Sequence, residues 1–172
     1  MSSKPVLYLF SGLPGSGKST LAQRVVQRVH AAYVRIDSIE QALRDFCSIE
    51  VAGEGYGLAY RIAGANLRLG ISVVADSCNP IELTRRAWEQ LAHKTLARYV
   101  NIEVVCSDVR EHRRRVESRG STVPGLKLPT WSEVENREYD KWLADRIVVD
   151  TSKKSEADCF NELVSRLLRD DA

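Results

Sequence analysis

Residues 12–19 read Gly-Leu-Pro-Gly-Ser-Gly-Lys-Ser, and this octapeptide matches the pattern GxxxxGK[ST] at every fixed position. An apolar run, Val6–Ser11, precedes it, and residues 21–30 continue with a helical pattern. A glycine-rich turn between a buried strand and a helix presents several backbone N–H groups to an anion, and the start of the helix adds partial positive charge. The octapeptide therefore predicts a loop that binds the phosphates of a nucleotide.

The residue types of this loop suit that chemistry. Glycine has no side chain to obstruct the phosphate oxygens, and it tolerates unusual backbone angles. Lys18 is expected to reach the β- and γ-phosphates as a cation, and the Ser19 hydroxyl to ligate Mg²⁺. The predicted nucleotide-binding residues of the loop are Gly12, Gly15, Ser16, Gly17, Lys18, Ser19 and Thr20.

Outward from the loop, short apolar runs alternate with helical patterns. The runs at residues 33–37, 71–76, 101–106 and 146–150 predict four further strands. The helical patterns cover residues 38–49, 56–69, 80–97, 109–119 and 156–169. Strands that alternate with helices form βαβ units, so we expect an α/β fold. Its five-stranded, mainly parallel sheet should carry helices on both faces.

Polar residues mark the expected helix starts. Asp108, Thr130 and Ser155 each stand three positions before an acidic residue, as in a capping box. Ser38 stands three positions before a glutamine, and Asn79 precedes a proline, a favoured first residue of a helix. These patterns predict side-chain caps at all five positions.

Length and composition indicate an ordinary globular chain. The 172 residues predict a single domain, 1–172, and 44% hydrophobic with 28% charged residues argue against disorder. The net charge of 25 − 23 = +2 is too small for a general nucleic-acid binder, although it does not exclude nucleic acid as a partner. No apolar run approaches the roughly 18 residues of a membrane span.

Two further observations bear on location. The apolar residues 5–10 are followed by a glycine-rich loop rather than a cleavage site, so no signal peptide is expected. The four cysteines form no CxxC pair and predict free, buried thiols in a reducing compartment. We therefore expect a cytoplasmic protein without a membrane anchor. The cysteines are Cys47, Cys78, Cys106 and Cys159.

Two carboxylates are expected at the carboxyl ends of strands, where ligands bind in doubly wound sheets. Asp37 ends the second predicted strand and Asp76 the third. One carboxylate could accept a proton from an attacking hydroxyl, and the other could hold Mg²⁺ through water. Either could instead cap the following helix, and the residues do not decide which carboxylate is base and which is metal ligand. Asp76 is therefore placed both among the substrate residues and among the metal ligands.

The helix predicted at 109–119 is rich in arginine. Arg115 and Arg119 are four apart and share a face next to residues 120–129, which contain two glycines and two prolines. That segment predicts an exposed loop, and residues 108–131 together a lid. A guanidinium suits the charge of a transferring phosphoryl group, so both arginines are candidate catalytic residues. Arg44 and Arg137 are candidate substrate contacts.

The chain resembles the small P-loop kinases. The segments that carry the resemblance are SGLPGSGKST (11–20), RIDS (35–38), VVADSCNPIELTRR (73–86), HRRRVESRG (112–120) and RIVVDTS (146–152). Nearest in pattern are the chloramphenicol-phosphotransferase-like, gluconate-kinase-like and polynucleotide 5′-kinase-like proteins of the AAA-type ATP-binding group. The resemblance implies the P-loop NTPase fold, ATP and Mg²⁺. It implies Asp37 as general base, Asp76 on the substrate side, Arg115 and Arg119 in the lid, and Thr151 beside the adenine.

The resemblance favours an ATP-dependent kinase that transfers the γ-phosphoryl group to a hydroxyl of a small molecule. Polynucleotide kinases of this kind have Asp-Asp-x-x-Arg after the second strand, whereas this chain has Asp37-Ser38-Ile39-Glu40-Gln41. Gluconate kinases enter the lid with a Lys-Gly-His type of sequence, whereas Gly120-Ser121-Thr122 follows Arg119 here. The alternatives are a polynucleotide or nucleotide-end kinase and an ATP-binding regulatory switch with slow hydrolysis. The sequence leaves the acceptor and the oligomeric state open.

Overall fold

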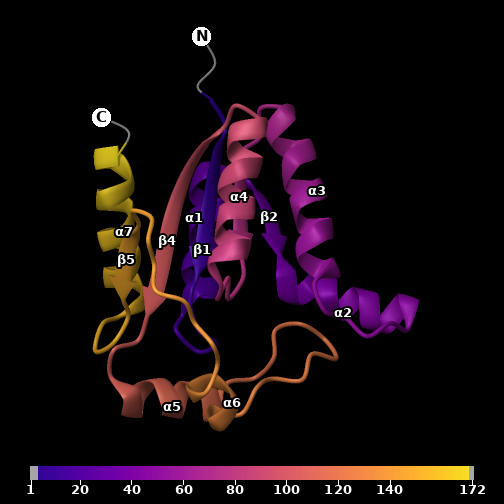
Figure 1. Cartoon of the computed structure of the whole chain (residues 1–172). Helices are drawn as coiled ribbons and strands as arrows, with labels where there is room; N and C mark the ends of the chain where they lie inside the picture. Colours follow the sequence, from indigo (N-terminus) through magenta and orange to yellow (C-terminus); the bar gives the residue numbers. More distant parts are fainter. Residues whose placement is uncertain (1–3, 171–172) are drawn as a thin grey trace.

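Five parallel strands form one sheet in the order β2-β3-β1-β4-β5 in the computed structural model, which describes residues 4–170 (Figure 1). The order places β1 in the centre, so the loop that follows it emerges between the ends of β3 and β4. Phe10 of β1 pairs with Asp76 of β3, which sets that carboxylate level with the start of the loop. The strands are β1 (Val6–Ser11), β2 (Ala32–Arg35), β3 (Val73–Asp76), β4 (Arg98–Val105) and β5 (Ile147–Asp150).

Helices cover both faces of the sheet, as predicted. One pair of helices, α1 and α7, lies on one face, and α3 and α4 lie on the other (Figure 1). The helices α2, α5 and α6 gather at the end of the sheet where the strands end. The helices are α1 (Lys18–Val29), α2 (Ile36–Cys47), α3 (Glu54–Arg68), α4 (Glu82–Lys94), α5 (Val109–Ser118), α6 (Trp131–Glu135) and α7 (Glu156–Asp170).

Two apolar clusters hold these layers together. Leu7 and Leu9 of β1 face α3 and α4, where Trp88 is fully buried. Phe10 faces α1 and α7 and packs with Leu163. Side chains of a strand alternate between its two faces, so a strand buried on both sides is apolar along its length. Burial of β1 on both faces therefore explains the continuous apolar run before the glycine-rich loop.

The ends of two elements differ from the prediction. The second strand ends at Arg35, so Asp37 lies in the first turn of α2 and Ser38 caps nothing. Asn79 is not the cap of α4, which begins at Glu82. Instead Asn79 has a φ of 49° and its amide donates to the Ser11 hydroxyl at 3.1 Å, which holds the turn after β3 against β1.

Two predicted caps are confirmed around the arginine-rich helix. Asp108 accepts hydrogen bonds from the backbone at the start of α5, and Thr130 forms a capping box with Glu133 at the start of α6. The segment between these helices is mostly exposed, as predicted, but Val123 is buried. Within residues 4–170 the cysteines are free, but Cys47 is exposed and Cys78 only half-buried, so the prediction of buried thiols holds for Cys106 and Cys159 alone. No helix in this range is long and apolar enough to cross a membrane.

Candidate active site

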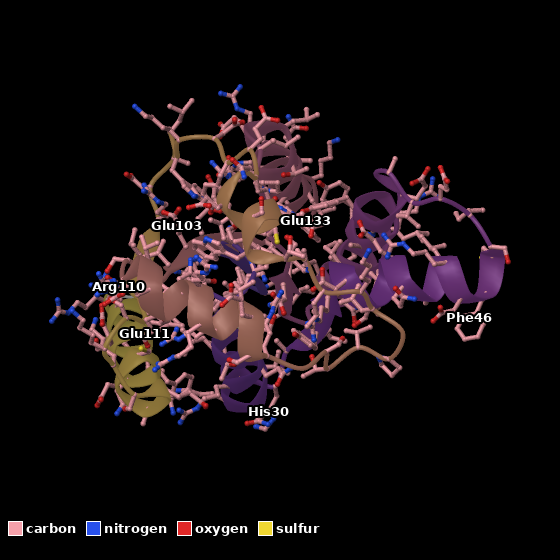
Figure 2. The ribbon with its side chains drawn as sticks, turned by 90° about the horizontal axis from the view of Figure 1, so that it is seen from below. His30, Phe46, Glu103, Arg110, Glu111 and Glu133 are labelled. Atoms are coloured by element: carbon pink, nitrogen blue, oxygen red, sulfur yellow. The ribbon has the colours of Figure 1, made fainter. Side chains whose placement is uncertain are left out.

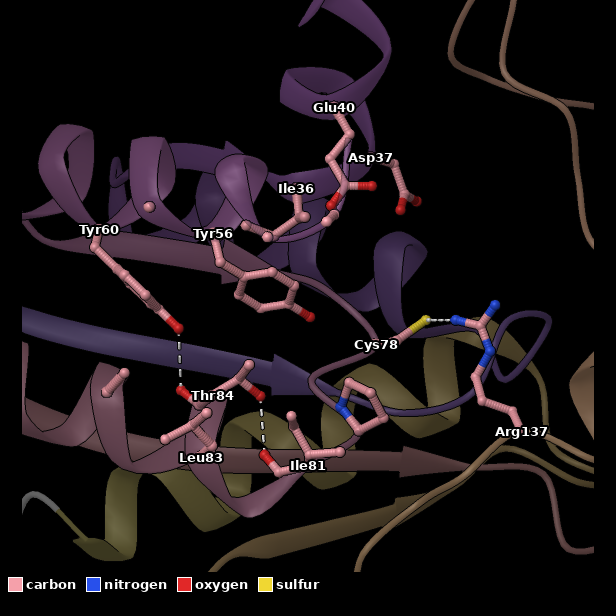
Figure 3. Close-up of a pocket in the computed structure, with 15 residues that line it drawn as sticks. Ile36, Asp37, Glu40, Tyr56, Tyr60, Cys78, Ile81, Leu83, Thr84 and Arg137 are labelled. Carbon is pink, nitrogen blue, oxygen red and sulfur yellow. Dashed lines mark hydrogen bonds between the residues drawn. The ribbon is translucent and has the colours of Figure 1, made fainter. Parts of the chain in front are cut away.

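Three adjoining hollows lie at the carboxyl ends of the strands, the end that faces the viewer in Figure 2. The loop cavity, about 220 Å³, contains Lys18, Ser19 and Arg119 in its wall. The Thr151 cavity, about 250 Å³, shares Gly15, Gly17, Thr20 and Arg115 with it. The tyrosine pocket, about 590 Å³, lies between α2, α3 and α4 and is lined by Tyr56 and Tyr60 (Figure 3).

The backbone of the glycine-rich loop has the conformation that its sequence predicts. Gly12, Gly15 and Gly17 have φ angles of 144°, 83° and 97°, which other residues rarely adopt. A Cβ at Gly12 would lie 2.2 Å from the carbonyl oxygen of Val104. Glycine is therefore required here for the close approach to β4 as well as for the turn.

The loop is held from two sides by side chains distant in sequence. The Thr151 hydroxyl donates to the carbonyl of Ser16 at 2.8 Å. On the other side Nε2 of His112 lies 2.8 Å from the carbonyl oxygen of Pro14. His112 of α5 and Thr151, which follows β5, thus hold the loop in place.

Lys18 is 6% exposed and lies among negative groups. Burial by itself lowers the pKa of its ammonium, but Cys78, Asp76 and Asp37 outweigh burial and raise the pKa above the usual value. Lys18 is therefore protonated throughout the neutral range. Its position in the wall of the loop cavity suits a cation that binds phosphate.

Asp76 lies at the end of β3, as predicted, and is 1% exposed. Its Oδ2 accepts a hydrogen bond from the Tyr33 hydroxyl at 2.6 Å, and the Arg35 Nε lies 3.9 Å away. No described residue hydrogen-bonds its Oδ1. A buried carboxylate oxygen without a partner is costly, so this oxygen is available to a ligand or to a hydrated metal ion.

Arg35 connects both predicted carboxylates to the lid. Besides Asp76, it reaches Asp37 Oδ2 at 3.5 Å and donates to the Thr122 hydroxyl at 2.8 Å. Arg35 was not predicted as a site residue, although it stands at the end of β2, where polar residues of a parallel sheet face the ligand crevice. The lid segment is thereby tethered to the floor of the site.

Asp37 lines the tyrosine pocket from the first turn of α2 (Figure 3). It therefore faces the crevice as predicted, although from a helix and not from a strand end. Its side chain is 36% exposed, so an incoming hydroxyl has access to it. Asp37 and Asp76 thus differ in kind, since one borders an open pocket and the other is enclosed.

The two candidate arginines, Arg115 and Arg119, differ in their hydrogen-bond partners. Arg115 donates to the Thr151 hydroxyl at 2.7 Å and to the Thr151 carbonyl at 3.0 Å, and it contacts Glu111 at 2.6 Å. Arg119 has a buried Nε that no described residue accepts from. Burial lowers the pKa of Arg119, although Cys78 and Asp37 oppose that effect. Arg119 is thus a partly buried cation that an anion in the loop cavity would pair.

Most of the remaining predicted residues lie around the same hollows, whereas Gly12 and Ser16 line a separate cavity. Ser19 and Thr20 line the loop cavity, and Thr151 lines the Thr151 cavity. Arg137 lines the tyrosine pocket and lies 3.7 Å from the Cys78 sulfur (Figure 3). Arg44 is not among the residues that line that pocket; it lies 3.5 Å from Glu40 on the same helix.

Sequence reasoning missed several wall residues of the tyrosine pocket, among them Glu40, Tyr56 and Tyr60. Two signals were present. Glu40 follows Asp37 by three positions, so both lie on one face of α2. The two tyrosines are four apart on α3, which also places them on one face. Neither spacing distinguishes a pocket wall from a packed core.

Comparisons with known proteins agree with this architecture. The family model described as "AAA domain" matches residues 7–146. Among curated protein sequences no match is found. A solved structure from Chloroflexus aurantiacus is similar with a TM-score of 0.75 at 19% identity and covers 97% of this chain and 98% of its own.

Two similar structures are kinases. A gluconokinase from Sinorhizobium meliloti has a TM-score of 0.70 at 14% identity, over 96% of this chain and 93% of its own. An APS kinase from Mycobacterium tuberculosis, solved with AMPPNP and APS, has a TM-score of 0.68 at 15% identity, over 95% and 98%. At these identities the likeness establishes the fold, which is the predicted α/β P-loop NTPase fold.

Proposed function

We propose that this chain, which belongs to the AAA domain family, is an ATP-dependent kinase that phosphorylates a hydroxyl group of a small molecule. The observation that carries the proposal is the adjacency of the loop cavity and the tyrosine pocket, with Asp37 beside their junction. Arg35 lines the loop cavity, and Asp37, which lines the pocket, is 3.5 Å from it. A phosphoryl donor and an acceptor could therefore meet at Asp37.

The donor side suits a nucleoside triphosphate. The glycine loop would hold the phosphates through backbone N–H groups, with Lys18 as a fixed cation among them. The Thr151 cavity, which continues from the loop, would take the base. Because the APS kinase structure contains AMPPNP, an ATP analogue, ATP is the donor that we expect for this fold.

Mg²⁺ suits a residue of the loop cavity and a carboxylate beside it, since Arg35 in the cavity wall lies 3.9 Å from Asp76. The Ser19 hydroxyl lies in the wall of that cavity, and the Oδ1 of Asp76 is buried without a partner among the described residues. Ser19 would hold the ion directly and Asp76 through water. When bound, Mg²⁺ neutralises charge on the phosphate oxygens.

In the proposed transfer step each of these side chains has a distinct role. The acceptor oxygen attacks the γ-phosphorus. The bond between the γ-phosphorus and the β,γ-bridging oxygen breaks, and ADP leaves. Asp37 takes the proton of the attacking hydroxyl. Lys18 and Arg119 stabilise the charge that spreads over the transferring group. Arg115 acts through Thr151, since it holds that residue against the loop.

The tyrosine pocket favours a small molecule over a nucleic-acid end. Its wall contains two carboxylates, Asp37 and Glu40, and one basic residue, Arg137. A polynucleotide acceptor would bring phosphates, which carboxylates repel and which nucleic-acid sites bind with clusters of lysine and arginine. The position of Asp37 also argues against a regulatory switch, which needs no base on the acceptor side.

The test is phosphate transfer from γ-labelled ATP to a library of small alcohols and to oligonucleotides with free 5′-hydroxyl ends. We expect labelled products among the small alcohols and none among the oligonucleotides. Asp37→Asn should lower that labelling by roughly a hundredfold while the protein still binds ATP. Hydrolysis to free phosphate with no labelled acceptor would refute the kinase and favour the switch.

A further inference from the structure

The tyrosine pocket has a rigid aromatic wall. Tyr60 donates to the carbonyl of Thr84 at 3.4 Å and packs edge-on against Trp88, with ring centroids 4.6 Å apart. The Tyr56 hydroxyl accepts from the backbone N–H of Asn79 at 3.1 Å. Burial raises the pKa of Tyr56 to about 12, so its phenol is neutral. The wall therefore offers two fixed, uncharged rings whose hydroxyls are already engaged.

The opposite side of the pocket is formed by apolar side chains. Ile81 and Leu83, from α4 and the segment before it, lie across from the tyrosines (Figure 3), and Ala87 of α4 also lines the pocket. Such surfaces gain from burying an apolar or aromatic body of a ligand, at about 25 cal/mol per Å². The pocket of about 590 Å³ is in the range of small-molecule sites.

Charge in the pocket is divided between its two ends. Arg137 lies at the Cys78 end (Figure 3). The backbone N–H of Gly12 donates to the Cys78 carbonyl at 3.1 Å, so this end of the pocket adjoins the glycine-rich loop and is assigned to the phosphoryl group. Glu40 lies farther along α2, beyond Asp37 and away from Arg137. The end of the pocket that contains Glu40 therefore faces the part of the acceptor molecule that is not phosphorylated.

Glu40 is constrained to this position and only partly compensated. A Cβ at Gly55 would lie 2.3 Å from the Glu40 Cγ, so the absence of a side chain at Gly55 gives the glutamate its place against α3. Arg44 contacts Glu40 at 3.5 Å but is itself 39% exposed. Burial raises the pKa of Glu40 despite Arg44, so its carboxylate is under-compensated in the free pocket.

We propose, resting on the proposed function, that the acceptor carries a protonated amino group as well as the hydroxyl, and that Glu40 binds the ammonium while Asp37 faces the hydroxyl. Residues three apart on a helix have Cβ atoms about 5–6 Å apart, so the two groups of the acceptor are separated by a similar distance. The tyrosine rings add to the selection, because ammonium groups are attracted to aromatic faces. The substrate class is thus an amphipathic amino alcohol.

The experiment compares amino alcohols with their N-acetyl derivatives, for example a phenyl-substituted propanolamine and its N-acetyl form. Acetylation removes the charge and leaves the hydroxyl and the apolar body. Transfer from γ-labelled ATP is measured for the wild type, for Glu40→Gln and for the control Glu50→Gln, an exposed carboxylate outside the pocket. Binding of each compound is measured separately by calorimetry in the presence of AMPPNP.

For the wild type and Glu50→Gln we expect the free amine to exceed its acetylated form in kcat/KM and in affinity. The expected factor is roughly tenfold to a hundredfold, the loss for one unpaired charged hydrogen bond. Glu40→Gln should remove that preference, mainly through KM, and leave the acetylated compounds unaffected. Transfer to neutral alcohols without preference for amines, or a preference that survives Glu40→Gln, would overturn the inference and leave the kinase standing.

Binding separates the inference from the proposed function. If amines bind through Glu40 but no alcohol is phosphorylated, the ammonium site stands and the kinase falls. If there is neither transfer nor binding that depends on Glu40, both are overturned.

Discussion

Arg115 and Arg119 look equivalent in the sequence, but from the structure we expect their removal to affect stability differently. Arg115 makes two hydrogen bonds to Thr151, at 2.7 and 3.0 Å, and these hold Thr151 against the glycine loop. A hydrogen bond to a charged group contributes about 1.5 kcal/mol at the low end of its range, suited to a partly exposed arginine. Arg115→Ala should therefore lower the free energy of unfolding by about 2–3 kcal/mol.

Arg119→Ala should have no such cost. Its Nε is buried without a described acceptor, and burial lowers the pKa of its guanidinium more than Asp37 raises it, so removing the cation relieves a poorly compensated charge. Its loss should instead slow phosphoryl transfer by roughly 10²–10³, which corresponds to about 3 kcal/mol of barrier. ATP affinity should change less than turnover, because the charge it meets develops during transfer.

The assay combines thermal unfolding followed by circular dichroism with single-turnover transfer at saturating ATP. Arg115→Ala should lower Tm by about 5–10 °C, since 1 kcal/mol corresponds to about 2–4 °C in a domain of this size. Arg119→Ala should leave Tm unchanged or raise it. The exposed Arg110 on α5 (Figure 2) provides the control, and Arg110→Ala should change neither quantity. Equal losses of Tm for Arg115→Ala and Arg119→Ala would refute the reasoning.

Three further substitutions test the rest of the site. Lys18→Met should lower transfer at least about a hundredfold while the circular dichroism spectrum stays native, and normal turnover would remove the donor site. Asp37→Asn should lower single-turnover transfer by roughly a hundredfold with ATP affinity unchanged, whereas a joint loss of ATP and Mg²⁺ binding would make Asp37 a metal ligand. In Gly15→Ala the new Cβ would lie 2.6 Å from the Val116 Cγ2 at a φ of 83°, so denaturant unfolding should show a loss above about 1 kcal/mol.

The tertiary structure decided how α2 and the turn after β3 begin. The prediction of Ser38 and Asn79 as helix caps is wrong: α2 already begins at Ile36, and Asn79, in the turn after β3, hydrogen-bonds Ser11 at the end of β1. A cap is a local preference, and a partner 68 positions away along the chain can override it. The capping box of Thr130 and Glu133, in which both partners are local, is confirmed.

The sequence by itself determined the glycine-rich loop, the alternation of strands and helices and the parallel sheet. Each of these depends on backbone angles or on side-chain periods that neighbouring residues specify. The tertiary structure decided what each charged side chain contacts. Arg115 binds Thr151, whereas the Nε of Arg119 has no acceptor among the described residues. Arg35 lies between two carboxylates, and Glu40 lines a pocket together with tyrosines. The physical reason is that an ion pair or a pocket wall joins residues that only the packing of distant elements brings together.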